Sequence, residues 1–196
     1  MRLLSRCNLV AYRLPLRWSG RVHLMSIEVS FLELDDKEKI TYLFKKDKIL
    51  QNRFCKFLAK GFRGIVWYNE NDWISYSWIS LPETDGPPHL PRYIRQLPVY
   101  WIFYCRTKEE YRGRGLYKAS LSILCNWARK RDPKAEIYID TEPSNVPSRK
   151  AIEAVGFTPA GIISVWTLGL PKLGSVVIGG SWNKEAEHPH PGVDLL

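Results

Sequence analysis

The chain has 196 residues, of which 45% are hydrophobic, 13% aromatic and 25% charged. This composition excludes a chain that is disordered throughout, and the length suits one globular domain with a sizeable core. The longest apolar stretch, Leu97–Cys105, contains a proline. It falls well short of the roughly 18 residues that a membrane-spanning helix needs, so no membrane span is expected.

The net charge of +9 arises largely at the beginning of the chain. The first 24 residues hold five arginines and no acidic residue, whereas the remainder has 24 basic and 20 acidic residues. A basic balance favours phosphorylated or nucleic-acid partners, but confinement of the charge to one segment weakens that inference. Residues 1–24 are either an extra packed segment, such as a strand, or a dispensable extension upstream of a start at Met25. A transit peptide is a third interpretation.

Four cysteines are scattered along the chain without a Cys-x-x-Cys pair or a neighbouring histidine cluster: Cys7, Cys55, Cys105 and Cys125. Neither a metal site nor a disulfide framework is therefore expected. A reducing, cytoplasmic compartment is the simplest interpretation.

The first half of the chain alternates between strand and helix periodicity. Ile27–Leu34 mostly alternates apolar and polar residues, which predicts a half-buried strand. From residue 35 to about residue 60, apolar residues recur every three or four positions, which predicts one or two amphipathic helices. Ile65–Tyr68 and Trp73–Ser80 flank a polar turn and predict a β-hairpin. Its tryptophans are expected in the core: Trp67, Trp73 and Trp78.

A long loop is predicted at Leu81–Leu97, because its prolines remove backbone donors and fix φ, which excludes regular structure. Its cationic side chains, His89, Arg92 and Arg95, could select an acidic acceptor, although a solvated loop face is the favoured interpretation. Pro98–Cys105 follows as a run of large apolar residues, which suits a strand buried on both faces.

The second half predicts, in order, a helix, a strand, a short helix and two strands. They are expected at Gly115–Arg131, Ala135–Thr141, Pro147–Val155, Gly161–Leu168 and Ser175–Ile178. Ser144 or Asn145 is expected to cap the short helix, and Gly156 to end it. A polar tail over residues 183–196 is expected to be flexible. This order of elements predicts an α/β protein in which helices flank a mixed sheet.

Arg112-Gly-Arg-Gly-Leu-Tyr117 lies between a predicted buried strand and a predicted helix. The first N–H groups of a helix have no acceptors within it, and glycines let phosphate oxygens approach the backbone. Such a turn is therefore typical of an anion site. It lacks the third glycine of a dinucleotide fingerprint and the Gly-Lys-Ser/Thr of a P-loop, which disfavours NAD and nucleoside triphosphates.

This turn resembles the Arg/Gln-x-x-Gly-x-Gly/Ala loop that holds the acyl-CoA pyrophosphate in the GNAT superfamily of N-acetyltransferases. A second block is similar to that family's Asn-x-x-Ala-x-x-Leu-Tyr-x-Lys-x-Gly-Phe segment, with Asn145, Gly156 and Phe157 in matching places. Two blocks in the right order, each in a suitable strand or helix context, make the resemblance specific over Tyr104–Phe157.

The resemblance implies a GNAT-like fold: a mixed, mostly antiparallel sheet flanked by helices, with acyl-CoA bound at a splay between two central strands. The acetyltransferase domain is expected over residues 25–182, between the basic segment 1–24 and the flexible tail 183–196. Acetyl-CoA would be a co-substrate, and no metal is implied.

Carried over by position, the resemblance assigns backbone amides around Cys105 and Thr107 to the pantetheine and the acetyl carbonyl. Amides from Arg112 to Tyr117 would hold the pyrophosphate, and Asn145 would contact the pantetheine arm. An N-cap with a purely structural role is an equal alternative for Asn145. The residues so assigned to acyl-CoA are Cys105, Thr107, Arg112, Gly113, Arg114, Gly115, Leu116, Tyr117 and Asn145.

Two positions depart from the family pattern. Tyr117 replaces the small residue that usually ends the loop, and Ile152 stands where many members have the tyrosine that serves as general acid. Tyr104 and Glu142 are the candidates for acid and base, because both are expected near the gap between the two central strands. The alternative for Asp140 and Glu142 is the exposed face of a strand.

The resemblance implies an acyl-CoA-dependent N-acyltransferase that moves an acetyl group from acetyl-CoA to a primary amine by direct attack. A small-molecule amine is the expected acceptor, with an amino sugar as the first candidate. One alternative is acetylation of a protein amine, a peptide amine or an aminoacylated RNA. Another is a non-catalytic module that binds nucleic acid or phosphorylated surfaces through its basic N-terminus, although nucleic acid is not the expected partner. A homodimer is compatible with terminal strands that pair between subunits.

Overall fold

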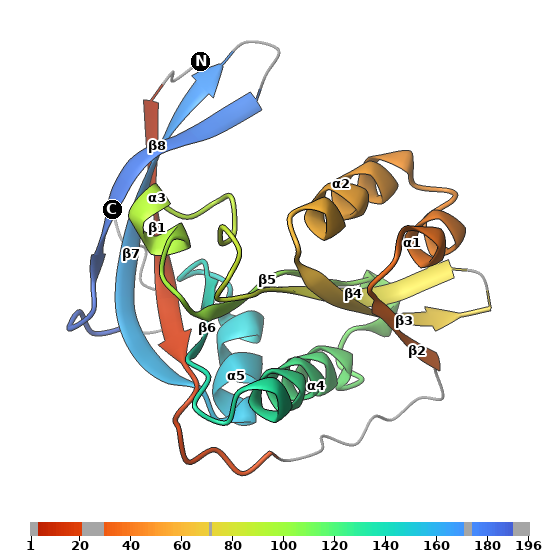
Figure 1. Ribbon diagram of the computed structural model, residues 1–196. Coiled ribbons are helices and arrows are strands. Elements are labelled where there is room, and N and C mark those ends of the chain that lie inside the picture. Colours follow the sequence, from red (N-terminus) through yellow and green to blue (C-terminus); the bar gives the residue numbers. More distant parts are fainter. Residues whose placement is uncertain (1–3, 21–29, 71, 171–173, 190–196) are drawn as a thin grey trace.

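The computed structural model of the protein describes residues 4–20, 30–70, 72–170 and 174–189. Its centre is one eight-stranded sheet with the order β2-β3-β4-β5-β6-β1-β7-β8. Only the β5–β6 pair is parallel among the strand pairs of the described chain, and the others are antiparallel. Helices α1 and α2 lie on one face of the sheet, and α4 and α5 lie on the other (Figure 1). The expected mixed, mostly antiparallel α/β sheet is confirmed.

The first half of the sheet follows the sequence prediction closely. It consists of β2 (Ser30–Leu34), α1 (Lys37–Leu43), α2 (Lys48–Ala59), β3 (Arg63–Asn69) and β4 (Asp72–Ser80). Two aspartates cap the N-termini of these helices. The side chain of Asp36 accepts from the Lys39 amide, and that of Asp47 accepts from the Leu50 amide. The predicted start of the first strand, at residues 27–29, lies outside the described residues. The three hairpin tryptophans are buried as expected.

The second half of the sheet begins at the parallel pair. Strand β5 (Tyr100–Thr107) leads through a 3₁₀ turn, η1 (Glu109–Tyr111), into α4 (Leu116–Arg131). Strand β6 (Ile137–Thr141) and α5 (Val146–Val155) follow. Side chains alternate across β5. Trp101 and Phe103 join the core beneath α1 and α2, whereas Ile102 joins the core against α4 and α5.

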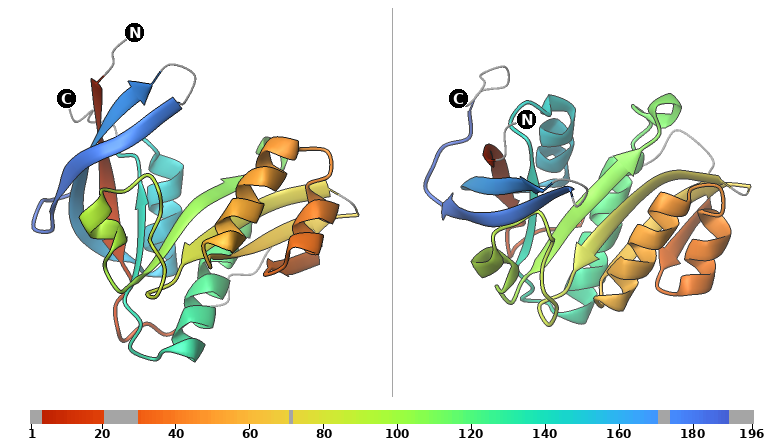
Figure 2. Two further views of the ribbon diagram at one scale, coloured as in Figure 1. Left: turned by 45° about the horizontal axis from the view of Figure 1, so that its top comes forward. Right: turned by 90° about the horizontal axis from the view of Figure 1, so that it is seen from above.

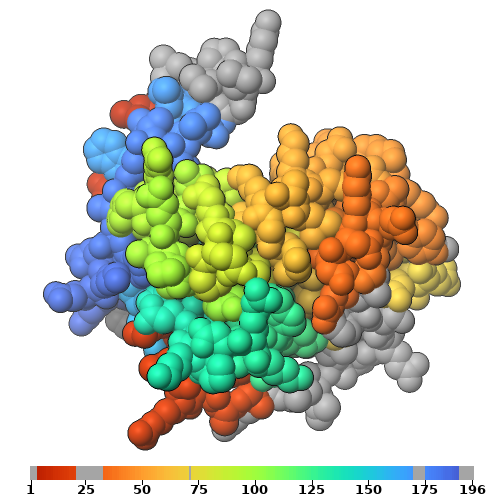
Figure 3. All heavy atoms as spheres, in the orientation of Figure 1, coloured from red at the N-terminus to blue at the C-terminus, as the bar shows by residue number. Residues whose placement is uncertain are grey.

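The proline-rich loop contains one element that the sequence prediction excluded. A single helical turn, α3 (Arg92–Arg95), begins after Pro91. Pro91 is the N-cap residue, and its carbonyl oxygen accepts from the amides of Ile94 and Arg95 at 3.0 and 3.1 Å. Its missing N–H breaks no helical hydrogen bond, because the helix begins only at Arg92. The loop lies on the same face of the sheet as α1 and α2 (Figure 1). Its side chains lie between these helices and the C-terminal strands, which are blue in Figure 3.

Strand β1 (Leu4–Arg13) is an inner strand, although it lies in the segment that the sequence analysis set apart. It pairs with β6 on one side and with β7 (Thr158–Leu170) on the other. Strand β8 (Gly174–Asn183) forms the edge. In β1, Val10, Ala11 and Tyr12 have no exposed surface. Residues 4–13 thus form a packed strand of the sheet. Met25 lies outside the described residues.

The arginines of β1 are engaged with the sheet. The Arg6 guanidinium donates to Ser164 Oγ at 3.0 Å, and Arg13 forms an ion pair with Glu136 at 2.5 Å.

Strands β1, β7 and β8 curve away from the part of the sheet that carries α1 and α2 (Figure 2).

The tail was expected to be flexible from residue 183, and the structure differs over residues 183–189. The His188 ring packs edge-on against Tyr12 with centroids 4.6 Å apart, and its Nε2 lies 3.1 Å from the Gly161 carbonyl oxygen. The Arg149 guanidinium donates to the Pro189 carbonyl at 2.7 Å. This part of the tail is held by β1, β7 and α5, since its ring and carbonyl groups find buried partners there. Residues 190–196 lie outside the described residues.

Replacement of Tyr12 tests whether β1 belongs to the cooperative core. Its hydroxyl donates to Glu153 at 2.9 Å and accepts from Arg149 at 3.2 Å. We expect Tyr12→Ala to lower the free energy of unfolding by about 3–5 kcal/mol, because it leaves a cavity. The control Tyr12→Phe keeps the ring and should cost about 1–2 kcal/mol. Urea denaturation measures both values, and a Tyr12→Ala variant as stable as the wild type contradicts the assignment.

Candidate active site

The sheet splits between its two parallel strands. Strands β5 and β6 are paired at only three positions, from Tyr100 with Ile137 to Ile102 with Ile139. Beyond these pairs both strands continue, and β5 extends to Thr107 without pairing to β6. The backbone groups that face this gap are therefore available to a ligand. This is the splay that the sequence resemblance implied.

A bulge in β5 lies at the same point. The register between β4 and β5 shifts between the pairs Tyr76–Arg106 and Trp78–Phe103, so that β5 has one extra residue. Within the bulge Tyr104 has a φ of 49°, a left-handed conformation that is rare for a non-glycine residue. Bulges re-aim side chains and often lie beside active sites. This one directs Tyr104 toward α2, where its ring contacts Phe54 and Phe57.

The N-terminus of α4 has the features of an anion site. Gly115 is the N-cap residue with a φ of 84°, and no side chain caps the helix. Gly113 has a φ of 75°, and a Cβ added there would meet nothing within 4 Å. The first amides of this 16-residue helix thus have no side-chain acceptor, and the positive end of the helix dipole lies at the same point. These are the amides assigned from sequence to a pyrophosphate.

Two arginines flank this turn and remain exposed. The Arg112 side chain reaches the Thr107 carbonyl at 3.4 Å and Glu109 at 3.5 Å. Arg114 donates to the Glu110 carbonyl at 3.2 Å and lies over the Tyr111 ring. Long contacts with exposed partners hold a guanidinium loosely, so both side chains remain available to an anion.

Tyr117, the departure from the family pattern, points away from the loop. Its hydroxyl lies 3.2 Å from Ser148 Oγ, so the side chain spans from α4 to α5. Burial, with smaller contributions from Cys105 and Asp140, raises the pKa of Tyr117 well above its usual value. The phenol is therefore a neutral hydroxyl beneath the splay. Leu116 is buried beside it, so this position can offer a ligand only its backbone.

Cys105 and Thr107 lie on the unpaired part of β5. Burial raises the pKa of the Cys105 thiol to about 12, although hydrogen bonds from Ser77 and the Trp78 backbone oppose the shift. A protonated thiol is a poor nucleophile, so we assign the half-buried Cys105 side chain no nucleophilic role. Thr107 Oγ1 lies 2.8 Å from Ser75 Oγ, which fixes this end of the strand.

Asn145 caps α5. Its Oδ1 accepts from the Ser148 amide at 3.2 Å, and its side chain is otherwise exposed. The capping alternative raised from sequence is therefore present. A cap uses the oxygen of the amide group, which leaves Nδ2 as a donor.

The two catalytic candidates from sequence differ in their surroundings. Arg53 of α2 donates to the Tyr104 hydroxyl oxygen, and its guanidinium lies 5.0 Å from the Tyr104 ring centroid. The phenol oxygen thus accepts one bond, and its own hydrogen can be donated elsewhere. Glu142 follows β6, is exposed, and acts electrostatically on Cys7 of β1. The structure brings Tyr104 to the splay with a polar partner and leaves Glu142 at its rim.

A buried polar group at the splay was missed by the sequence analysis. The Asp140 side chain is only 6% exposed, so its assignment to an exposed strand face is wrong. Asp140 accepts from Trp101 Nε1 at 2.6 Å, and both its carboxylate oxygens lie 3.1 Å from His89 Nε2. His89, expected on a solvated loop face, is instead paired with the sheet. The two residues are 51 positions apart, and no local pattern links them.

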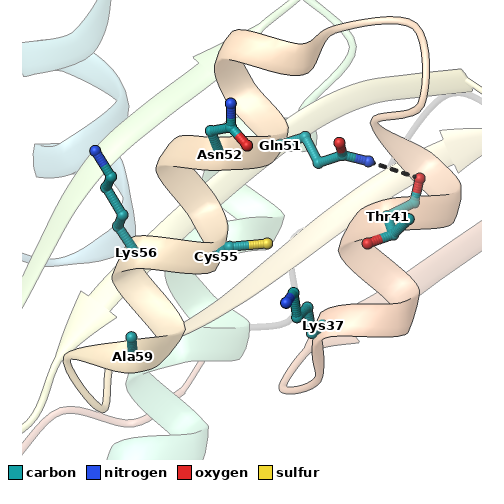
Figure 4. A pocket seen from close by; sticks show the side chains of 7 residues that line it. All are labelled: Lys37, Thr41, Gln51, Asn52, Cys55, Lys56 and Ala59. Atoms are coloured by element: carbon teal, nitrogen blue, oxygen red, sulfur yellow. Dashed lines mark hydrogen bonds between the residues drawn. The ribbon is translucent and has the colours of Figure 1, made fainter.

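An open groove of about 430 Å³ lies between α1 and α2 (Figure 4). The Gln51 side chain crosses it to donate to the Thr41 carbonyl at 3.1 Å. None of the residues assigned to acyl-CoA is among its lining residues, which are Lys37, Thr41, Gln51, Asn52, Cys55, Lys56 and Ala59. The groove is thus a feature of helix packing, separate from the splay.

Over the described ranges, no three or more histidine, cysteine, aspartate or glutamate side chains gather as metal ligands do. The helices of the same ranges include none long and apolar enough to span a bilayer.

Comparison with known proteins agrees with this architecture. A model of the acetyltransferase (GNAT) family matches residues 28–157, well over half of the chain. No curated protein matches the chain.

Solved structures give similar folds at low sequence identity. The fold resembles a GNAT-family acetyltransferase from Colwellia psychrerythraea, with a TM-score of 0.54 and 16% identity over 80% of this chain and 54% of that one. A GCN5-related N-acetyltransferase-like protein from Streptococcus suis 89/1591 gives a TM-score of 0.53 and 15% identity over 84% and 62% of the two chains. The present chain thus spans less than two thirds of the length of these two chains.

A third similar fold is that of AAC(6')-Iy, solved in complex with the bisubstrate analog CoA-S-monomethyl-acetylneamine. Its TM-score is 0.50 at 17% identity, over 67% of this chain and 92% of that one. At such identities the likeness concerns the fold, whereas the family match rests on the sequence itself. Because the family model matches well over half of the chain, the protein belongs to the GNAT family of acetyltransferases.

Proposed function

We propose that the protein transfers the acetyl group of acetyl-CoA to the primary amine of a small molecule by direct attack. The observation that carries this proposal is the uncapped N-terminus of α4, with its two left-handed glycines, beside the unpaired stretch of β5. One feature suits a pyrophosphate and the other suits an extended arm with amide groups. Membership in the GNAT family supports their combination.

In this proposal the backbone does most of the binding. Amides from Arg112 to Tyr117 hold the pyrophosphate, with Arg112 and Arg114 adding charge. Amides around Cys105 and Thr107 meet the pantetheine and the acetyl carbonyl. Asn145 Nδ2, which the cap leaves as a donor, contacts the pantetheine arm.

The thiolate that leaves must be protonated by a side chain or by solvent. Ile152, at the position where many members of the family have a tyrosine, has no hydroxyl to donate. We assign the donor to Tyr104, whose phenol oxygen already accepts from Arg53. Glu142 stays a candidate base at the rim of the splay, where its exposure leaves its carboxylate solvated.

Two guanidinium groups, those of Arg53 and Arg106, would affect which acceptor amine binds. Arg53 and Arg106 are exposed, and in the described residues neither forms an ion pair with a carboxylate. Both act on the Tyr76 hydroxyl: burial raises the pKa of Tyr76, and Arg106 and Arg53 oppose that shift. Tyr76 in turn stacks on Tyr104 at 5.8 Å. These cations favour an amine that also carries an acidic group, such as an amino sugar phosphate, over a polycationic acceptor.

The alternative of nucleic-acid binding through the basic N-terminus has less support. Arg6 and Arg13 of that segment are engaged with Ser164 and Glu136, as described above. Such binding would weaken steeply with salt because of counterion release. A salt-sensitive complex with oligonucleotides, in a protein that does not bind acetyl-CoA, would favour this alternative.

Titration calorimetry tests the acyl-CoA site. We expect binding of acetyl-CoA and desulfo-CoA well above that of ATP. Gly115→Glu places a negative charge at the pyrophosphate amides and should weaken acetyl-CoA binding by about 100-fold or more, since losing charge-assisted hydrogen bonds costs about 1.5–3 kcal/mol each.

Gly115→Ala is the matched control, because it imposes the same left-handed strain without the charge. Circular dichroism shows whether each variant is folded. Unchanged acetyl-CoA affinity in folded Gly115→Glu would falsify the site assignment.

The charge of the acceptor is tested with matched amines: glucosamine against glucosamine 6-phosphate, and ethylamine against alanine. Thiol release from acetyl-CoA gives kcat/KM for each. We expect the acidic member of a pair to be preferred, and Arg53→Gln or Arg106→Gln to reduce that preference about tenfold, as one charge-assisted hydrogen bond predicts. Lys60→Gln, an exposed cation at the end of α2, is the control. Equal rates within each pair would contradict an acidic acceptor.

A further inference from the structure

We propose that His89, oriented by Asp140, accepts the proton that the acceptor amine loses during acetyl transfer. This inference rests on the proposed function and names the catalytic base of that same site. It replaces Glu142 in that role, because Glu142 lacks a partner that would orient it among the contacts of the described chain.

The location of Asp140 is the first support. It directly follows Ile139, the last residue of β6 that pairs with β5, so it lies at the point where the sheet splits. Alternation along the strand puts it on the same face as Tyr138, which belongs to the core beneath α1 and α2. The same face carries the proline-rich loop (Figure 1). The acyl-CoA loop leads into α4 on the opposite face, which leaves this face for the acceptor.

The burial of Asp140 is the second support. A carboxylate with only 6% of its side chain exposed needs hydrogen bonds and a compensating charge. Trp101 Nε1 supplies a neutral donor at 2.6 Å. His89 supplies the group that can carry a positive charge. The buried carboxylate of Asp140 can therefore stabilise an imidazolium that forms at His89 during a reaction.

The orientation of His89 is the third support. A carboxylate only accepts, so the ring nitrogen between the two oxygens of Asp140, Nε2, carries its hydrogen. Nδ1 is then the basic nitrogen. The His89 side chain is 40% exposed, so its ring can be reached from solvent on the acceptor face. This arrangement of a buried acid, an oriented imidazole and an accessible basic nitrogen is that of a general base.

The charges around the pair agree with this role. Burial lowers the pKa of His89, but the charge of Asp140 and the hydrogen bond to it outweigh this effect, and the net shift is upward. Asp140 also raises the pKa values of Cys7 on β1, Cys105 on β5 and Tyr117 on α4, which are neutral thiols and a neutral phenol. Among the described residues, the charge of Asp140 is thus the one that acts on His89.

In the proposed reaction the amine attacks the thioester directly. The lone pair of the neutral amine forms a C–N bond to the thioester carbonyl carbon, and the C–S bond breaks with its electron pair on sulfur. One amine hydrogen leaves as a proton to His89 Nδ1. A proton donor or solvent protonates the thiolate, and His89 returns its proton to solvent. The products are the acetamide and coenzyme A.

Nuclear magnetic resonance titration of the histidine ring protons tests the pairing without any acceptor. His89→Gln identifies the His89 signal. In the wild type we expect its pKa above that of an ordinary histidine, and in Asp140→Asn we expect a lower pKa, because the carboxylate that favours the imidazolium is gone. A His89 pKa that is the same in both proteins overturns the role of Asp140.

Kinetics test the role of His89 itself, with the acceptors of the matched screen. We expect His89→Gln to lower kcat about 100-fold or more at pH 7. In the wild type the rate should rise with pH as His89 loses its proton, and in Asp140→Asn this rise should move to lower pH. Gln96→Ala, at the end of α3 in the same loop and exposed, is the control and should behave as wild type.

Acetyl-CoA calorimetry separates the two proposals. His89→Gln should bind acetyl-CoA as wild type does, because it touches none of the residues assigned to that ligand. A His89→Gln variant with wild-type kcat and pH profile overturns the base assignment while the acetyltransferase proposal stands. A wild-type protein that does not bind acetyl-CoA overturns the proposed function, and this inference with it.

Discussion

The short parallel pairing of β5 with β6 is the constraint on which the site depends. Three residue pairs hold the two halves of the sheet together, and past Ile102 and Ile139 the strands have no shared ladder. A sheet that stops pairing leaves backbone donors and acceptors in its interior, where each unpaired group is costly. The bulge at Tyr104 and the buried Asp140 both lie at this point. The unpaired backbone groups at the split therefore need hydrogen-bond partners, and a ligand with amide groups can supply them.

The rest of the fold keeps this split open in a defined shape. On the far side, β1 holds β6 by antiparallel pairing, and β7 holds β1. On the near side, α2 packs aromatic residues against Tyr104 and Tyr76. The proline-rich loop connects the two sides through the contact of His89 with Asp140. The two halves also share one core on each face of the sheet, and the site lies at the split between them.

Much of the fold and of the candidate site could be predicted from the sequence, for reasons that differ from element to element. The Gly113–Gly115 turn and the following helix are local, so their pattern predicted an anion site directly. The family resemblance extended that site to the β5–β6 splay. Strand β1 was left open, because a single ten-residue segment does not reveal its partners in the sheet. The pairing of His89 with Asp140 and of Arg53 with Tyr104 joins residues 51 positions apart in each case, and only the fold brings them together.

The pairing of β1 also fixes the order in which the molecule can form. Strands β3 and β4 are joined by a short turn, so their hairpin can form early from local contacts. Ser5 and Thr167, which meet across β1 and β7, are 162 residues apart. Closing so long a loop costs chain entropy before its contacts stabilise it, and such non-local pairing is slow. We therefore expect β1 to pair with β6 and β7 late in folding, so that the side of the split formed by β6 is completed only when the two ends of the chain have come together.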